Sequence, residues 1–189
     1  MAVLCLLRPL LGLCVLRSGQ AQDNSYSTPT TPHELMPAPS IEQASRDWLT
    51  QWWADSNLTP TPTLIATERP ARAACRYPLI VVRQLPGGRE ERCLGHLEPA
   101  TITDRVAVNV HGGTHDDTSA KTVALTIAEN TRDALVAMTG RTVPSTIDGL
   151  PDASCVRVEI IDRPRWRPTL DPGHDLAGYE FFARVTLRV

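Results

Sequence analysis

The chain has 189 residues, 42% of them hydrophobic, which is enough to form the core of one domain of ordinary size. Its formal net charge of -2 excludes a protein that is basic throughout and holds nucleic acid by neutralising phosphates. Its five cysteines are odd in number, widely scattered and without metal-binding spacing, which indicates free thiols in a reducing compartment.

The first 39 residues differ in composition from the rest of the chain. Residues 1–22 are an apolar run that Arg8-Pro9 interrupts, and residues 23–39 are rich in Ser, Thr, Pro and Asn. The polar part cannot bury enough apolar surface to fold alone. We interpret residues 1–39 as an N-terminal arm and linker that docks on a partner chain, and a secretory signal is the alternative.

A first helix is predicted over residues 41–56, with Ser40 as its N-cap and Gln43 as the capping-box partner. Its apolar residues recur at helical spacing: Ile41, Ala44, Trp48, Leu49 and Trp52. We expect the two tryptophans of this stripe to pack in the core. Trp53 lies off the stripe, and an exposed tryptophan is typical of an interface, so we expect Trp53 to contact another subunit.

Strand-like segments follow the helix. We expect a strand at Thr63–Thr67, a hairpin of Tyr77–Leu85 and Arg89–Leu97 around a Pro86-Gly87-Gly88 turn, and a strand at Thr101–His111. The valines of the last strand, Val106, Val108 and Val110, share one face, and its polar residues share the other.

The second half of the chain predicts a helix from Asp116 to Met138, with Gly140 as its left-handed cap, and strands at Ser154–Asp162 and Tyr179–Val189. With the hairpin counted as one element, the order is α-β-β-β-α-β-β. We therefore expect an α+β fold over residues 40–189, a single domain in which an antiparallel or mixed sheet carries a helix across one face.

The run Val108–Ala120, VNVHGGTHDDTSA, concentrates residue types that bind metals or act as nucleophiles. His111 continues the polar face of its strand, Gly112-Gly113 permit a sharp reversal, and Asp116, Asp117 and Thr118 suit a helix N-terminus. No further histidine or acid follows one helical turn after Asp117, as a metal site needs. We interpret the run as a joint between strand and helix.

The connection Arg163–Gly178 is long for a loop without function. It carries Arg163, Arg165, Trp166 and Arg167 between prolines, and stiff chain with arginine and tryptophan is typical of an interface. These four residues are therefore expected to contact a partner protein, and a solvated loop is the alternative.

The region Ala71–Val189 resembles the tail terminator proteins of long-tailed bacteriophages. The likeness rests on element order and on three segments: RPARAACRYPLIVVRQLPGG, DRVAVNVHGGTHDDTSAKTVALTIAENTRDAL, and RPRWRPTLDPGHD before YEFFARVTLRV. The resemblance implies a non-enzymatic virion protein that forms a ring, usually of six copies. Such a ring caps the finished tail tube, ends its growth and joins it to the head connector.

The resemblance further implies neither catalytic residues nor a cofactor, a metal or a membrane partner. It implies partners in the tail tube protein and the head-tail connector or stopper, assembly in the host cytoplasm, and DNA that passes through the lumen without specific binding. In such a ring, neighbours would cover one face of the wholly apolar run Leu79–Val82. The N-terminal arm is longer than is usual in this family.

Two alternatives to this assignment are open. The first is a head-side connector or another minor virion protein of similar fold. The second is a small metal-dependent hydrolase that uses His111, His115 and Asp116.

Overall fold

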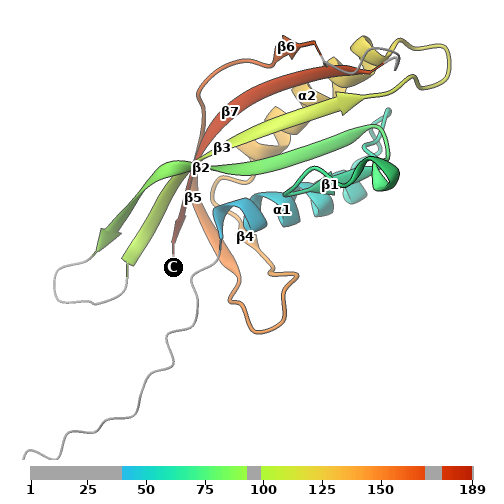
Figure 1. Cartoon of the computed structure of the whole chain (residues 1–189). Helices are drawn as coiled ribbons and strands as arrows, with labels where there is room; N and C mark the ends of the chain where they lie inside the picture. The colour runs from blue at the N-terminus through green and yellow to red at the C-terminus, as the bar shows by residue number, and fades with distance from the viewer. Residues whose placement is uncertain (1–39, 93–98, 169–175, 189) are drawn as a thin grey trace, which may run out of the picture. The chain divides into compact units, whose positions relative to one another are not determined.

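The structure is a computed structural model that describes residues 40–92, 99–168 and 176–188. Besides one short 3-10 helix (Arg72–Ala74), two α-helices and seven strands follow one another along these residues (Figure 1). They are α1 (Ile41–Asp55), β1 (Leu64–Ala66), β2 (Leu79–Arg92), β3 (Pro99–Gly112), α2 (Ala120–Ala137), β4 (Thr142–Val143), β5 (Ala153–Ile160), β6 (Arg165–Arg167) and β7 (Ala177–Arg188). The predicted arm at residues 1–39 lies outside the described residues.

The strands form one mixed sheet in the order β1-β2-β3-β7-β5-β4, and β6 also pairs with β7. β1 runs parallel to β2, and the other neighbours are antiparallel. The predicted α+β class is therefore confirmed. The predicted element order holds as well, with two short additions, β4 and β6, that the sequence pattern did not indicate.

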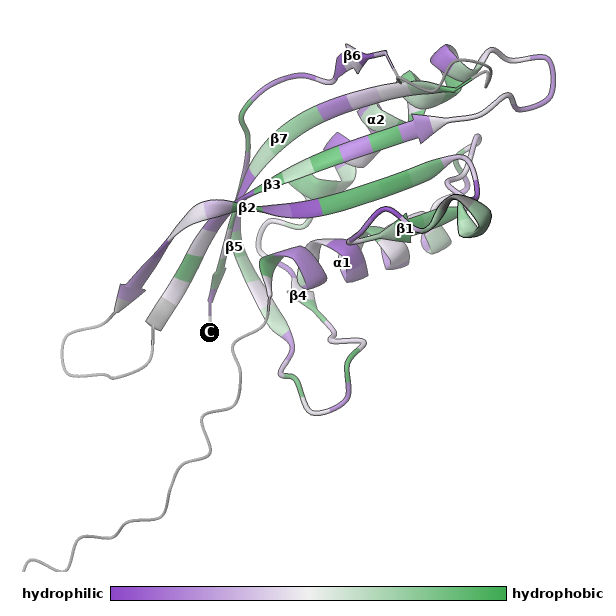
Figure 2. Cartoon of the chain, viewed as in Figure 1, coloured by the Kyte–Doolittle hydropathy of each residue, from purple (hydrophilic) through white to green (hydrophobic). Residues whose placement is uncertain are grey.

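Alternating residues place one face of the sheet in the hydrophobic core. The three valines of β3 are fully buried, and so are Phe181, Ala183, Val185 and Leu187 of β7, as the alternation predicts. Residues of both helices belong to the same buried cluster, so α1 and α2 pack on this face of the sheet. Figure 2 shows the resulting contrast along β2, which is hydrophobic beside the helices and polar beyond them.

The hairpin predicted around Pro86-Gly87-Gly88 is wrong. β2 continues through these residues as one strand, and β3 pairs with it on both sides of them. The register shifts between Leu85 and Arg89, and Gly87 has a φ of 104°, so the segment is a bulge rather than a turn. The chain connecting β2 to β3 falls at residues 93–98, outside the described residues.

The run Leu79–Val82 is buried on both faces, as predicted, with exposed fractions between 0% and 2%. However, this burial is achieved within a single copy of the chain. The expectation that ring neighbours cover one face of this run is therefore wrong, and the run gives no evidence about oligomeric state.

The exposure predicted for Trp53 is also wrong, because its side chain is only 3% exposed. The buried row of α1 follows steps of four residues through Ser45, Leu49 and Trp53. Trp48 is partly buried beside α2, where its indole Nε1 donates to the carbonyl oxygen of Ala134 at 2.7 Å. Helix α1 packs against α2 on one side and against the segment 61–65 on the other. It therefore buries more side chains than the single predicted apolar stripe contains.

Helix α1 begins as predicted, but its cap is only half of a capping box. The Ser40 side chain accepts from the backbone N–H of Gln43 at 3.5 Å. The side chain of Gln43 instead donates to the carboxylate of Asp47 at 2.9 and 3.0 Å. Gln43 therefore supports the buried acid one turn along the helix rather than the cap.

Candidate functional site

The run Val108–Ala120 is a joint between β3 and α2, as interpreted from the sequence. The joint differs from the prediction in where the helix begins. His115 and Thr118 exchange backbone hydrogen bonds of 3.3 and 2.9 Å across a tight turn, and Asp116 within that turn has a φ of 49°. Ser119 then caps α2 by accepting from the N–H of Thr122 at 3.3 Å. The residues expected at the helix N-terminus, Asp116 to Thr118, therefore form the turn instead.

Gly112 has a role different from the one predicted. Among the described residues the glycines with positive φ are Gly87, Gly140 and Gly149, so Gly112 does not need left-handed backbone. A Cβ atom at Gly112 would instead lie 2.4 Å from the carbonyl oxygen of Ala120 and 2.7 Å from the Cβ of Ala124. Glycine at this position lets α2 lie directly against the end of β3.

His111 follows the buried Val110 in β3, so its side chain lies on the opposite face of the sheet from the helices. Its neighbours across the sheet are Leu79 and Gly178. It is nevertheless half-buried, and its Nδ1 is a buried atom without a hydrogen-bond partner. Burial, and then the nearby charge of Arg69, lower the pKa of His111, so the ring is neutral at pH 7.

The residues of the hydrolase alternative do not form a metal site. His115 Nδ1 lies 3.1 Å from an oxygen of Asp116, in an exposed pair within the turn. In the described part of the chain, no group of three or more His, Cys, Asp or Glu side chains is placed to hold a metal ion. A zinc site needs three or four converging protein ligands, and a single pair provides too few.

Two cysteines can be located, and both are free thiols, as predicted. Cys155 is buried in the core, and this burial raises its pKa to about 11. Its thiol is therefore protonated at neutral pH and is a poor nucleophile. Cys75 is partly exposed, and its Sγ lies 3.4 Å from the carbonyl oxygen of Pro70.

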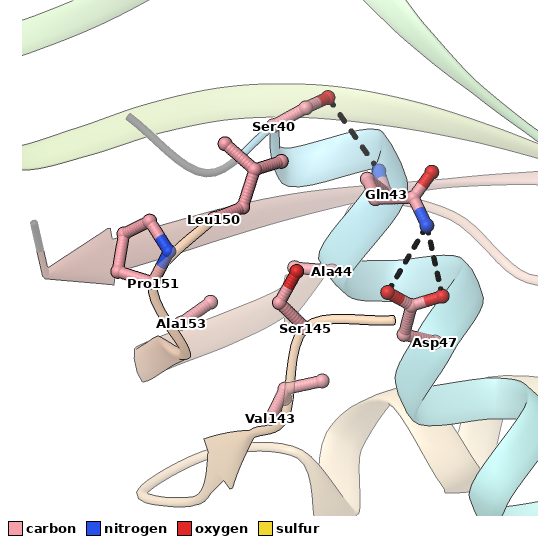
Figure 3. A pocket seen from close by; sticks show the side chains of 9 residues that line it. All are labelled: Ser40, Gln43, Ala44, Asp47, Val143, Ser145, Leu150, Pro151 and Ala153. Carbon is pink, nitrogen blue, oxygen red and sulfur yellow. Dashed lines mark hydrogen bonds between the residues drawn. The ribbon is translucent and has the colours of Figure 1, made fainter. Parts of the chain in front are cut away.

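A small pocket lies between α1 and the segment that joins β4 to β5 (Figure 3). Its lining residues are Ser40, Gln43, Ala44, Asp47, Val143, Ser145, Leu150, Pro151 and Ala153. The cavity volume is about 10 Å³, which is room for about one water molecule. The pocket is therefore a packing feature around the Asp47 carboxylate and too small for an organic substrate.

The predicted interface residues gather at β6. Arg165, Trp166 and Arg167 form a strand paired with β7, whereas the sequence predicted an extended loop throughout. Residues 169–175 of that loop lie outside the described residues. Arg163 precedes the strand and is exposed. The pairing with β7 fixes the direction in which the β6 side chains project.

The side chains of β6 point to opposite sides of the sheet. Trp166 is opposite Tyr179, on the helix side, and is 52% exposed. Lys121 of α2 lies above its ring, with Nζ 5.1 Å from the ring centroid. On the other side Arg167 Nη2 pairs with Glu180 at 2.9 Å, and Arg165 Nε lies 3.5 Å from Asp162.

Lys121 is a member of this site that the sequence pattern did not indicate. It stands in the first turn of α2, 45 positions before Trp166 in the sequence. A cation above an indole ring stabilises the pair by about 0.5–1 kcal/mol at an exposed site. The pair therefore helps hold Trp166 in place while leaving half of its surface open.

Apart from Trp166, the described residues hold six exposed large hydrophobic side chains: Leu58, Leu125, Val136, Ile147, Val156 and Ile161. Trp166 has the largest exposed fraction in this group. No described helix is long and apolar enough to cross a membrane. The exposed aromatic group at β6 is thus the strongest candidate contact surface in the described chain.

Comparison with solved structures gives a structural likeness, whereas sequence comparison gives none. Neither the protein-family models nor the curated protein sequences match this chain. Among solved structures, the chain is similar to a chain in the virion of a native gene transfer agent particle, with 14% sequence identity and a TM-score of 0.47. That likeness covers 79% of this chain and 100% of the other.

Proposed function

We propose that this chain is a structural virion protein of a long-tailed phage or phage-like particle. Six copies form a ring that caps the tail tube, ends its growth and joins it to the head connector or stopper. The sequence resemblance of Ala71–Val189 to tail terminator proteins supports this proposal, and the α+β class expected with it is the class found. DNA passes through the lumen of the ring.

The observation that carries the proposal is the surface at β6. Tryptophan and arginine are the residues most enriched where interfaces gain their binding energy. Here Arg165, Trp166 and Arg167 are all exposed, and pairing of β6 with β7 fixes them in a defined direction. An ordered chain loses little conformational entropy on binding, which favours a contact surface for the adjoining ring or tube.

Trp53 has no place in the proposed interface. Its side chain is part of the core of the protomer, so it is not available to another subunit. The proposed contact residues are therefore Arg163, Arg165, Trp166 and Arg167, together with Lys121, which lies against Trp166.

The test replaces Arg165, Trp166 and Arg167 together by alanine. Truncating an arginine at the centre of an interface typically costs upward of about 2 kcal/mol, whereas on a solvated segment the change is usually within about 0.5 kcal/mol. We expect the melting temperature of the purified variant to stay nearly unchanged, while attachment of heads to tails fails in particle assembly.

The matched control replaces two arginines and one large apolar residue at exposed positions away from β6: Arg76, Arg141 and Ile147, each by alanine. This variant is expected to assemble normally. A normal yield of infectious particles from the β6 variant would show that the segment is only a solvated connection.

A further inference from the structure

Arginines gather on the sheet face that the helices leave uncovered, beyond the buried part of β2 and β3. Cross-strand partners share a face, and so do alternate residues along a strand. By these rules and the observed register, one face carries six exposed arginines, which we call the arginine face: Arg83, Arg89, Arg105, Arg157, Arg184 and Arg188. The chain is slightly acidic as a whole, so positive charge is concentrated here.

Most of this charge is not neutralised by other described residues. Arg184 pairs with Glu159 at 3.0 Å, and Arg89 lies 3.5 Å from Glu91. The other four arginines of the face form no ion pair with any described residue. Arg105 and Arg184 are direct partners across β3 and β7, and like charges placed opposite each other destabilise a sheet. Folding alone therefore gives no reason for this arrangement.

The composition of the arginine face distinguishes between kinds of anionic partner. Protein interfaces have an apolar core with aromatic anchors. The exposed aromatic residue of the described chain, Trp166, lies on the helix side of the sheet. Between the arginines lie hydroxyl side chains, and Thr103 and Thr186 share a hydrogen bond of 3.0 Å. Arginine with threonine or serine is the combination that contacts the phosphates of nucleic acids.

The face is also hollowed around Arg105, and both arginines and acids line this hollow. A depression of about 480 Å³ is lined by Gly87, Arg89, Glu91, Thr103, Asp104, Arg105 and Arg184. Among the described residues this face carries no fully exposed aromatic side chain, since Phe182 on it is only partly exposed, whereas binding of single strands ordinarily uses exposed aromatic rings. A duplex, whose phosphates lie on its outside, fits this surface better.

We propose that the arginine face binds the phosphate backbone of double-stranded DNA without sequence preference. The choice of DNA over RNA rests on the proposed function, in which DNA passes through the ring. Binding itself needs no ring, because the six arginines belong to one copy of the chain.

The experiment measures binding of the purified full chain to a fluorescent DNA duplex at several salt concentrations. We expect the association constant K to fall as the salt concentration rises. Each neutralised phosphate makes the negative slope of log K against log salt steeper by about 0.9. The variant Arg83→Gln with Arg105→Gln should lower that slope by about 2 and weaken binding by about tenfold in 0.2 M salt. The matched control is Arg76→Gln with Arg132→Gln, which changes the net charge equally and should bind as the wild type does.

Several outcomes would overturn the inference: no DNA binding by the wild-type chain, or equal losses in the two double variants. Equally tight binding to poly-glutamate would assign the face to an acidic protein partner, and stronger binding to duplex RNA would refute the choice of DNA. A failure of DNA binding would not refute the proposed ring. The ring is tested separately, by the mass of the assembly and by the attachment of heads to tails in the β6 variant.

Discussion

Asp47 is the most heavily hydrogen-bonded carboxylate among the described residues. It is 5% exposed, and it accepts from Gln43, Arg46 and both the backbone N–H and the hydroxyl of Thr146. Thr146 stands in the segment after β4, so one acid joins the middle of α1 to that segment. Burial acts to raise the pKa of Asp47, but the hydrogen bonds from Arg46, Gln43 and Thr146 together lower it.

Replacing Asp47 by alanine should lower the free energy of unfolding at pH 7 by about 2 kcal/mol, because hydrogen bonds to a charged group contribute about 1.5–3 kcal/mol and several partners lose theirs. Urea unfolding measures this change. The control is Asp55→Ala, at the exposed last residue of α1, which should change stability by less than about 0.5 kcal/mol. Equal losses in the two variants would show that the Asp47 contacts contribute nothing.

The same residue predicts a dependence on pH. A carboxylate whose pKa is lower in the folded state contributes stability above its unfolded pKa of about 3.9, and this contribution is lost as pH falls through the folded pKa. The stability difference between the wild type and Asp47→Asn should therefore be constant near neutral pH and shrink below about pH 4. Unfolding curves at a series of pH values measure it, and a difference that grows in acid would contradict the account.

The burial of single side chains could be predicted from the sequence only in part. Helical spacing located α1 and predicted that Trp48 and Trp52 pack on the core, but not that Trp53 is the most buried of the three. That outcome depends on the second layer around the helix, which periodicity does not contain. For His111, alternation gave the correct face of β3, while its burial depends on neighbours distant in sequence, such as Arg69.

At the scale of elements, the contact between α2 and β3 depends on a residue without a side chain. Gly112 ends β3, and α2 approaches it so closely that a methyl group would overlap backbone atoms of the helix. Backbone cannot move aside as a flexible side chain can, so the helix would have to shift away from the sheet.

Gly112→Ala should therefore destabilise the protein by about 3 kcal/mol, at the upper end of the usual range for overpacking. The matched control is Gly113→Ala, where the new Cβ would meet only the Cβ of Tyr77 at 3.1 Å, and the expected loss is below about 1 kcal/mol. Thermal unfolding of the two variants compares them. Similar stabilities would mean that α2 moves freely against β3 and that the close approach is unimportant.

The elements also show which sequence signals determine structure. The alternation in β3 and β7 extends over long strands, and it predicted both their buried faces correctly. Pro86-Gly87-Gly88 is an equally good signal for a turn and for a bulge, and the structure has the bulge because β3 pairs along β2 on both sides of it. β4 and β6 contain two and three residues, which is too short for any periodicity.

At the scale of the whole molecule, the two candidate surfaces differ in how far the sequence predicted them. The Arg163–Arg167 segment is contiguous, so its composition alone predicted a contact there. The arginine face is assembled from β2, β3, β5 and β7, and only the register of the sheet brings its members together. The net charge of the chain does not indicate the arginine face, because acidic residues elsewhere in the chain balance these arginines.

In the proposed function, copies of this chain form a ring at the end of a tail tube. Native mass spectrometry of the purified full chain, together with electron microscopy of tails that carry it, tests this claim most directly. We expect a closed assembly of six times the 20.7 kDa chain mass, in solution or on the tube end. A chain that stays monomeric at every concentration and is absent from particles would contradict it.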